Sequence, residues 1–297
     1  KTHSPEGRAA RATDDALRAV LDAVRDGTDR AARRDRDPVG FVHRYTTLED
    51  REIVALVAAS IAFGNVTTIR GKLEDLLGRV GRVAPSPAVA AEDPAALTAA
   101  LATWKHRVFL GDDLARLMIG ARRVQLTHGS LGARFREDLA REGTLKDALA
   151  TWCDAIRDAG DVRSTTRRGP AHLLPDPRGA SGCKRLVLFL RWMVRPDDGV
   201  DLGLWDVDPS VLLMPVDTHI HKLARNLGLT KRKDVSWKTT VEITRALARL
   251  DPSDPVKYDF SLCHLGMLQR CPSKKDAARC EGCGVKPVCR HWTFQVS

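Results

Sequence analysis

The sequence predicts an all-α fold, and three observations indicate it. Ala and Leu are abundant and aromatic residues make up only 5% of the chain, a composition that favours helices over strands. Apolar residues recur at helical spacing in most segments. Gly and Pro fall between these periodic segments, where helices are expected to end. Patterns typical of strands are almost absent, so we expect helices to pack on helices.

The expected helices follow a polar segment, 1–13, which has no hydrophobic period and is expected to be a loose leader. Leu17, Val20, Leu21 and Val24 then recur at helical intervals. Segment 53–61 is almost wholly apolar, as expected for a helix buried on most sides. Amphipathic or apolar helices are expected at 69–80, 94–104, 114–127, 131–139, 145–156, 186–194, 217–227, 237–250 and 256–268.

The charge of the chain points to an anionic partner. Lys and Arg total 48 against 38 Asp and Glu, which gives a net charge of +10. This excess favours binding to a polyanion, although charge by itself fits DNA, RNA and an acidic membrane equally. No apolar run approaches the roughly 18–20 residues that cross a bilayer, and the N-terminal residues lack the apolar core of a signal peptide. We therefore expect a soluble, cytoplasmic protein.

Four of the seven cysteines crowd into the last 27 residues, a distribution typical of a metal site. They are Cys271, Cys280, Cys283 and Cys289, with the spacing C-x8-C-x2-C-x5-C. Prolines and glycines between them let the chain fold back on one centre. Four thiolates can hold either a structural zinc ion or a [4Fe-4S] cluster, so the spacing leaves the metal open. The other cysteines, at 153, 183 and 263, are expected to pack in the core.

An acidic residue begins one of the expected helices, directly after a proline and a valine. The run is Pro-Val-Asp-Thr-His-Ile, residues 215–220. Asp217 or Thr218 is suited to cap the helix by accepting hydrogen bonds from its first backbone N–H groups. By itself the motif fits this structural role and a chemical role equally well.

These motifs, in this order, resemble the helix-hairpin-helix (HhH-GPD) DNA glycosylases of the endonuclease III type, of which the chain looks like a divergent branch. The resemblance runs from about residue 53 to 289 and is strongest at its C-terminal end. It implies a two-lobed helical fold with a DNA-binding cleft between the lobes and a C-terminal iron–sulfur loop. It also implies that Asp217 is catalytic and that the four clustered cysteines bind a [4Fe-4S] cluster.

The resemblance also implies a division into domains. A helical barrel domain is expected at 50–215 and includes the hairpin at about 164–185. The iron–sulfur domain is expected to combine 14–49 with 216–297.

The hairpin itself departs from the family pattern Leu-Pro-Gly-Val-Gly-x-Lys. Residues 174–184 read Leu-Pro-Asp-Pro-Arg-Gly-Ala-Ser-Gly-Cys-Lys, which is four residues longer, with Lys184 at the family's spacing from Gly182. An additional loop at 195–205 lengthens the interval from Lys184 to Asp217. In the family enzymes that also cut the strand, a lysine attacks the sugar, and the resemblance implies this role for Lys184. If Lys184 does not act in this way, the enzyme is monofunctional and this segment is a phosphate contact or a solvated connector. The hairpin residues expected to contact DNA are Arg178, Gly179, Ser181, Gly182 and Arg185.

Other departures concern the damaged base. The family's glutamine that fills the space left by the flipped base is replaced by Ala62, which leaves Phe63 or Asn65 as substitutes. Phe63, Trp192 and Trp205 are candidates for stacking on the base, although core packing is the preferred interpretation for each. Residues 53–63 contain no acid, which argues against the mechanism of the adenine glycosylases. Phosphate contacts are expected from Lys274, Lys275 and Arg279 in the cysteine loop, and from Arg225, Lys231, Arg232 and Lys233.

We therefore expect a monomeric, nucleoid-associated DNA repair enzyme that flips a damaged or modified base out of double-stranded DNA and excises it. Lyase activity at abasic sites through Lys184 is expected to accompany excision. Two alternatives stay open: a non-catalytic DNA-binding protein that keeps the glycosylase fold, and a zinc-containing RNA-binding module. The sequence does not identify the lesion.

Overall fold

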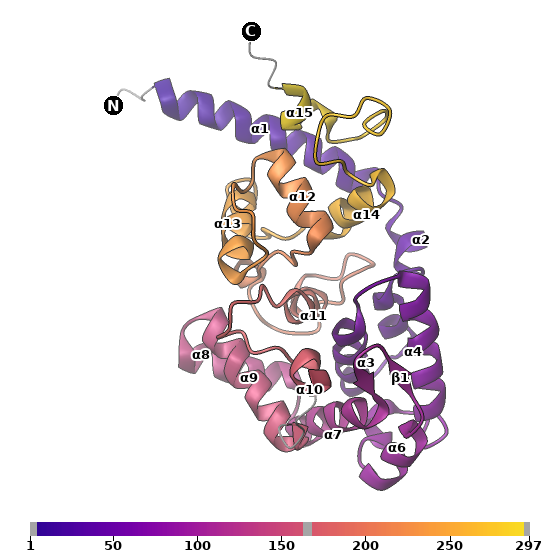
Figure 1. The fold of residues 1–297 in the computed structure, drawn as a ribbon. Helices are drawn as coiled ribbons and strands as arrows, with labels where there is room; N and C mark the ends of the chain where they lie inside the picture. Colours follow the sequence, from indigo (N-terminus) through magenta and orange to yellow (C-terminus); the bar gives the residue numbers. More distant parts are fainter. Residues whose placement is uncertain (1–4, 163–167, 294–297) are drawn as a thin grey trace. The chain divides into compact units, whose positions relative to one another are not determined.

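The computed structural model describes residues 5–162 and 168–293 and divides the chain into two compact units. Unit 1 combines residues 1–30 with 208–297, and unit 2 comprises residues 31–207. The described residues are mostly helical; their strands are β1, Lys105–His106, and β2, Phe109–Leu110, which pair as an antiparallel hairpin (Figure 1). The predicted all-α class is confirmed. No helix in the described ranges is long and apolar enough to cross a membrane.

Unit 2 is built around α3, Leu48–Ile61, whose residues from Ile53 to Ala59 are each at most 1% exposed. Helix α3 has no polar face, so α7, α11 and η1 can cover it from several sides. The remaining described elements of the unit are listed in chain order: α2 (Arg30–Arg34), η1 (Pro38–Arg44), α4 (Val66–Val80), α5 (Pro87–Ala90), α6 (Pro94–Leu101), α7 (Gly111–His128), α8 (Leu131–Glu142), α9 (Leu145–Ala159), α10 (Arg168–Leu173) and α11 (Lys184–Val194).

A buried carboxylate ties three segments of unit 2 together. Glu52 is fully buried and accepts hydrogen bonds from the Gln125 side chain (2.8 Å), from the backbone N–H groups of Leu131 (2.8 Å) and Gly132 (2.9 Å), and from the Trp205 indole (2.7 Å). Burial raises the pKa of Glu52, and these four donors oppose that shift. Glu52 therefore anchors the first turn of α8 to α3 and to the loop after α11.

That loop, 195–205, was expected as an insertion, and it is packed into unit 2. The backbone N–H of Leu202 donates to the Trp192 carbonyl (2.8 Å), and that of Trp205 donates to the Met193 carbonyl (2.9 Å). Asp201 is fully buried and pairs with the Arg191 guanidinium at 3.1 Å and with Arg195. The loop thus closes over the C-terminal end of α11.

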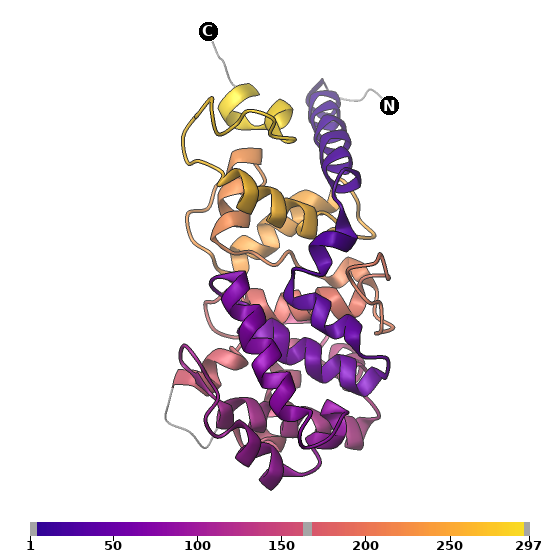
Figure 2. The same cartoon turned by 90° about the vertical axis from the view of Figure 1, so that its right-hand side faces the viewer.

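Unit 1 consists of α1 (Pro5–Asp26), η3 (Pro209–Val211), α12 (Thr218–Leu227), α13 (Trp237–Ala248), α14 (Asp259–Gln269), η4 (Lys286–Val288) and α15 (Arg290–Thr293). Helix α1 lies along α14 and η4 (Figures 1 and 2). The Tyr258 hydroxyl donates to Asp22 (3.0 Å) and the Arg18 guanidinium donates to the Leu250 carbonyl (2.8 Å). These long-range bonds join the two ends of the chain in one unit.

The structure differs from the expected organisation at two places. Residues 5–13 belong to α1 and not to a loose leader, because their run of Ala and Arg has high helix propensity. Residues 31–49 belong to unit 2 and not to the cysteine-containing unit, because Val39, Phe41 and Val42 of η1 are buried at the α3 side. Residues 208–215 belong to unit 1, where the Met214 backbone N–H donates to the Thr244 hydroxyl (2.9 Å).

Candidate functional site

Asp217 caps the N-terminus of α12. Its Oδ1 accepts hydrogen bonds from the backbone N–H groups of His219 and Ile220, both at 2.9 Å. The preceding residues, Met214 to Val216, are buried, whereas Asp217 is half-buried and Thr218 is exposed. The buried segment therefore fixes the backbone, and the carboxylate is held at the surface in a defined orientation.

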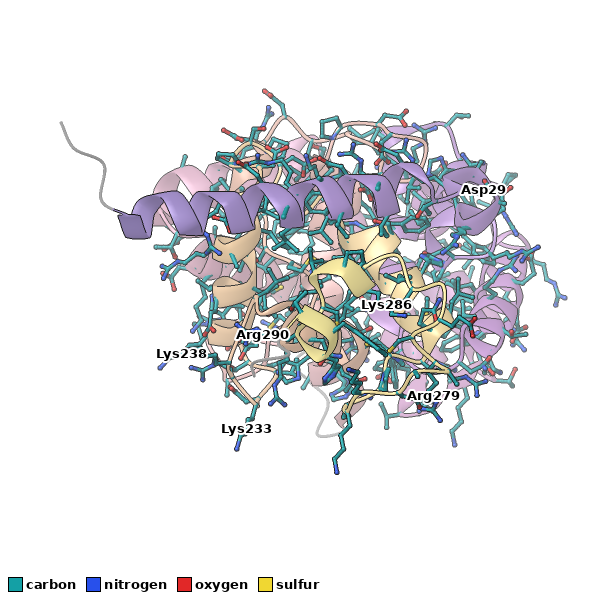
Figure 3. The ribbon with its side chains drawn as sticks, turned by 90° about the horizontal axis from the view of Figure 1, so that it is seen from above. Asp29, Lys233, Lys238, Arg279, Lys286 and Arg290 are labelled. Atoms are coloured by element: carbon teal, nitrogen blue, oxygen red, sulfur yellow. The ribbon has the colours of Figure 1, made fainter. Side chains whose placement is uncertain are left out.

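A basic hollow of about 610 Å³ begins at the residue after Asp217. Thr218, the first residue of α12, lines it, and Lys222 and Arg225 follow on the same helix face at intervals of four and three. Its other cationic lining residues are Lys231, Lys233 and Arg290. Figure 3 shows Lys233 and Arg279 along the lower edge of unit 1 in that view. This concentration of positive charge suits a polyanion.

The four clustered cysteines come together in unit 1. Cys271, Cys280, Cys283 and Cys289 line one tight cavity of about 10 Å³, with Leu223 and Trp292 among the other lining residues. Cys280 and Cys289 are buried, and Cys271 and Cys283 are half-buried. Burial raises the pKa of Cys271, the Asn226 amide opposes this, and the other three thiolates raise it further. Among the described residues, no group of three or more His, Cys, Asp or Glu could hold a metal ion.

The surroundings of this cavity supply polar contacts to sulfur and positive charge. The Asn226 amide donates to Cys271 Sγ (3.2 Å) and to the Pro272 carbonyl (3.1 Å). Lys275 and Lys286 each lie with Nζ 4.4 Å from the centre of the Trp292 ring. Lys275, expected as a DNA contact, is thus also a packing partner of α15. Of the other expected contacts in this loop, Lys274 is exposed, and the exposed Arg279 pairs with Asp276 at 3.4 Å.

The hairpin expected at about 164–185 covers α10 and the loop that leads to the start of α11 in unit 2, and its residues 164–167 lie outside the described part of the chain. Lys184 is the first residue of α11 and is half-buried; it follows Cys183, which has a left-handed backbone (φ 47°). Gly179 N–H donates to the Asp176 carbonyl (3.1 Å), and Cys183 N–H donates to the Ser181 hydroxyl (3.1 Å). These two amides are therefore used inside the loop, whereas the family pattern uses hairpin amides for a phosphate. Gly182 is buried.

The two arginines expected to contact DNA from the hairpin have internal partners. Arg178 pairs with Asp154 (2.6 Å) and Asp176 (2.9 Å), which raises its pKa. Arg185 donates to the backbone carbonyls of Ser60 and His172. Burial lowers the pKa of Arg185 to about 10. Arg185 therefore connects α3, α10 and α11, which corrects its expected role as a surface phosphate contact.

The aromatic candidates for stacking are packed inside unit 2. Trp205 is 4% exposed, with its ring centre 5.5 Å from that of Phe135, and Trp192 is 1% exposed. Both are core residues, which agrees with the core packing preferred for them from the sequence and not with stacking on a base. Phe63 is half-buried, and the guanidinium carbons of Arg107 and Arg185 lie 5.0 and 5.2 Å from its ring centre. Asn65 is exposed and caps α4 by accepting from Thr68 N–H (3.1 Å).

Site residues that the sequence did not single out are Lys222, Asn226 and Arg290. Lys222 follows Thr218 by one helical turn, which is a periodic signal that was available. Asn226 follows Lys222 by a further turn of α12 and carries the same signal, whereas Arg290 carries none, because it reaches the hollow only through the fold of the C-terminal segment. Arg232, expected on the same surface, pairs with Asp234 (3.0 Å).

Comparison with known proteins identifies a family. A family model described as "Protein of unknown function (DUF2400)" matches residues 37–268, which is well over half of the chain. The matched range includes Lys184 and Asp217 and ends before Cys271. No curated protein matches the chain, and no solved structure matches it.

Proposed function

We propose a function for this chain, which belongs to the family described as protein of unknown function (DUF2400), from its candidate site: it is a DNA glycosylase that excises a damaged or modified base. The observation that carries the proposal is the carboxylate of Asp217, oriented at the start of a helix whose next residue lines a hollow rich in Lys and Arg. A phosphate backbone bound in this hollow brings a nucleotide to the carboxylate. The two-lobed fold of the endonuclease III type is part of the proposal.

The proposed reaction begins when the target nucleotide rotates out of the duplex, at a cost of a few kcal/mol. The bond between C1′ and the base nitrogen then breaks, and the base leaves with the electron pair and takes up a proton. The negative charge of Asp217 stabilises the positive charge that develops on the sugar. Water then forms the new bond at C1′ and loses a proton, which leaves an abasic site.

Lys184 extends the proposal to strand cleavage. Its Nζ forms a bond to C1′ of the abasic sugar, and loss of water gives a Schiff base. Loss of a proton from C2′ and cleavage of the bond between C3′ and the phosphate oxygen then complete β-elimination.

The cysteine cavity supports a [4Fe-4S] cluster as part of the proposal, with zinc as the alternative. Four thiolates are the donor set that such a cluster takes, and the Asn226 amide at Cys271 Sγ is the kind of hydrogen bond that tunes it. The described residues do not form a metal-binding group as they stand, so binding would require the cysteine loop to close around the cluster. Cys271, Cys280, Cys283 and Cys289 would hold the cluster. When bound, it would cross-link the loop that carries Lys274 and Arg279 and would supply no redox step.

A non-catalytic DNA-binding protein is the second candidate, and one observation favours it. Asp217 Oδ1 already satisfies two backbone N–H groups, so the residue has a sufficient structural reason to be acidic. In that case the basic hollow binds DNA and no base is released.

The test is release of free base from duplexes that carry uracil, hypoxanthine, alkylated or oxidised bases. The wild type is expected to release at least one of them. Asp217→Asn keeps an oxygen for the helix cap but removes the charge, so it is expected to lose release while keeping its thermal stability. Asp208→Asn is the matched control, because Asp208 is an exposed cap of η3 in the same unit. Release that is absent from wild type, or unchanged in Asp217→Asn, favours the binding-protein candidate.

A further inference from the structure

One exposed arginine in unit 2 is held in a way that the proposed chemistry does not require. Arg107 occupies the two-residue turn of the β1–β2 hairpin, and its φ is 53°. Such a left-handed position in a tight hairpin turn favours Gly, Asn or Asp. An arginine there carries a conformational cost that surface solubility does not explain.

The side chain of Arg107 folds back onto the turn between α3 and α4. Its guanidinium carbon lies 5.0 Å from the centre of the Phe63 ring. It also covers Gly64, since a Cβ added at Gly64 would lie 2.3 Å from Arg107 Nη2. Gly64 has a φ of +102°, so the turn uses glycine both for its backbone and to leave room for the guanidinium.

Phe63 in turn packs against two rings of the β1–β2 hairpin. Its ring centre lies 5.5 Å from that of Phe109 in an edge-on arrangement and 5.7 Å from that of His106. His106 is 3% exposed; burial and then the charges of Arg107 and Lys72 lower its pKa. The guanidinium of Arg107 thus packs against a fixed aromatic ring and is restricted in its conformation.

Within the described ranges, the outer side of this arrangement is exposed and positively charged. Arg107 is exposed and forms no ion pair with another described residue. Its neighbour Val108 is 46% exposed, and Val66 at the start of α4 is 41% exposed. A planar cation beside exposed apolar side chains fits a nucleobase, which offers a flat π-face, on an anionic backbone. It fits a lone phosphate less well, because a phosphate gains nothing from the valines.

We infer that Arg107, supported by Phe63 and Gly64, stacks on an unpaired base of the bound DNA and so selects sites where pairing is lost. In this inference the group that stacks on the base is the guanidinium of Arg107, and Phe63 supports it. Arg107 is a specificity-determining residue, and the inference rests on the proposed function in taking DNA as the partner.

The test is binding to two DNA duplexes that differ only in one unpaired 2-aminopurine, with affinity and 2-aminopurine quenching as readouts. The wild type is expected to bind the duplex with the unpaired base more tightly and to quench its fluorescence. Since base stacking contributes about 1–3 kcal/mol, Arg107→Ala is expected to lower that preference about tenfold. Arg107→Lys is expected to do the same, because it keeps the charge but loses the planar group.

The matched control is Arg82, another exposed arginine of unit 2, whose Ala and Lys variants are expected to keep the wild-type preference. The inference is overturned if wild type shows no preference, if Arg107→Lys keeps the full preference, or if Arg107→Ala weakens binding to both duplexes equally, as a phosphate contact would. Because binding is measured without excision, failure of the proposed function is seen separately: Arg107-dependent preference without base release refutes only the chemistry.

Discussion

At the scale of single residues, burial decides which polar and aromatic groups are available for function. Trp192 and Trp205 are in the core, as preferred from the sequence, whereas Arg185, expected to contact DNA, donates to two carbonyl groups. A sequence shows that a side chain is aromatic or charged but not whether a distant helix covers it. Arg107 was missed for the converse reason, since its place over Phe63 depends on a hairpin of two-residue strands.

Lys184 yields a prediction at this scale. If it is the lyase nucleophile, borohydride is expected to trap a covalent adduct between wild type and DNA with an abasic site, because the Schiff base is reduced to a stable amine. Lys184→Ala is expected to form no adduct. Lys146→Ala is the control, because Lys146 is another lysine near the same segment. Its charge opposes the rise in the pKa of Cys183 that burial causes. An undiminished adduct in Lys184→Ala excludes Lys184 as nucleophile.

At the scale of elements, the long helices were predictable because each carries a continuous period of apolar residues. The helix expected at 131–139 is α8, Leu131–Glu142, and that expected at 186–194 is α11, Lys184–Val194. The short elements were not predictable, since η1, α5, α10 and the β1–β2 hairpin are each too short to show a period. Their conformations depend on the helices against which they pack.

The cysteine loop is the element whose chemistry can be tested directly. Protein purified without oxygen is expected to be brown, with broad visible absorption and with iron and sulfide that are lost on acid treatment. Cys283→Ala is expected to lose most of both, because it removes one of the four thiols of the cavity. Cys263→Ala is the control, since Cys263 is in α14 and does not line that cavity. A colourless protein that contains zinc would contradict the cluster.

The loop between α13 and α14 predicts a dependence of stability on pH. Burial opposes ionisation of Asp251, but hydrogen bonds from Lys257 (2.7 Å) and Ser253 (2.7 Å) lower its pKa to about 2. A lowered pKa stabilises the fold above the unfolded value of about 3.9, and this contribution is lost as the pH falls toward 2.

Asp251→Asn is therefore expected to lower the free energy of unfolding by about 1–2 kcal/mol at pH 7, after allowance for solvent screening. Urea unfolding at several pH values measures this difference, which is expected to shrink below pH 4. Asp15→Asn, in an exposed pair with Arg18, is the control and is expected to change stability little. A difference that stays constant down to pH 3 would show that Asp251 acts by packing and not by charge.

At the scale of the whole molecule, the order of the motifs carried more information than any one of them. Asp217 by itself is a helix cap, and the structure confirms that role. The cysteines by themselves fit zinc or iron. What the sequence could not supply is the basic hollow, which combines α12 with residues 230–235 and with Ser273, Arg290 and His291. These segments are distant in sequence, and only the fold of unit 1 unites them beside Asp217.

The central claim is that unit 1 holds DNA through its cations and acts on it through Asp217. Its most direct test is single-turnover base release at saturating enzyme, measured with DNA affinity for wild type, Asp217→Asn and Asp208→Asn. We predict that Asp217→Asn binds DNA within about threefold of wild type but releases base roughly a hundredfold more slowly, as expected when charge stabilisation of the transition state is lost. Equal rates in wild type and Asp217→Asn would contradict the account.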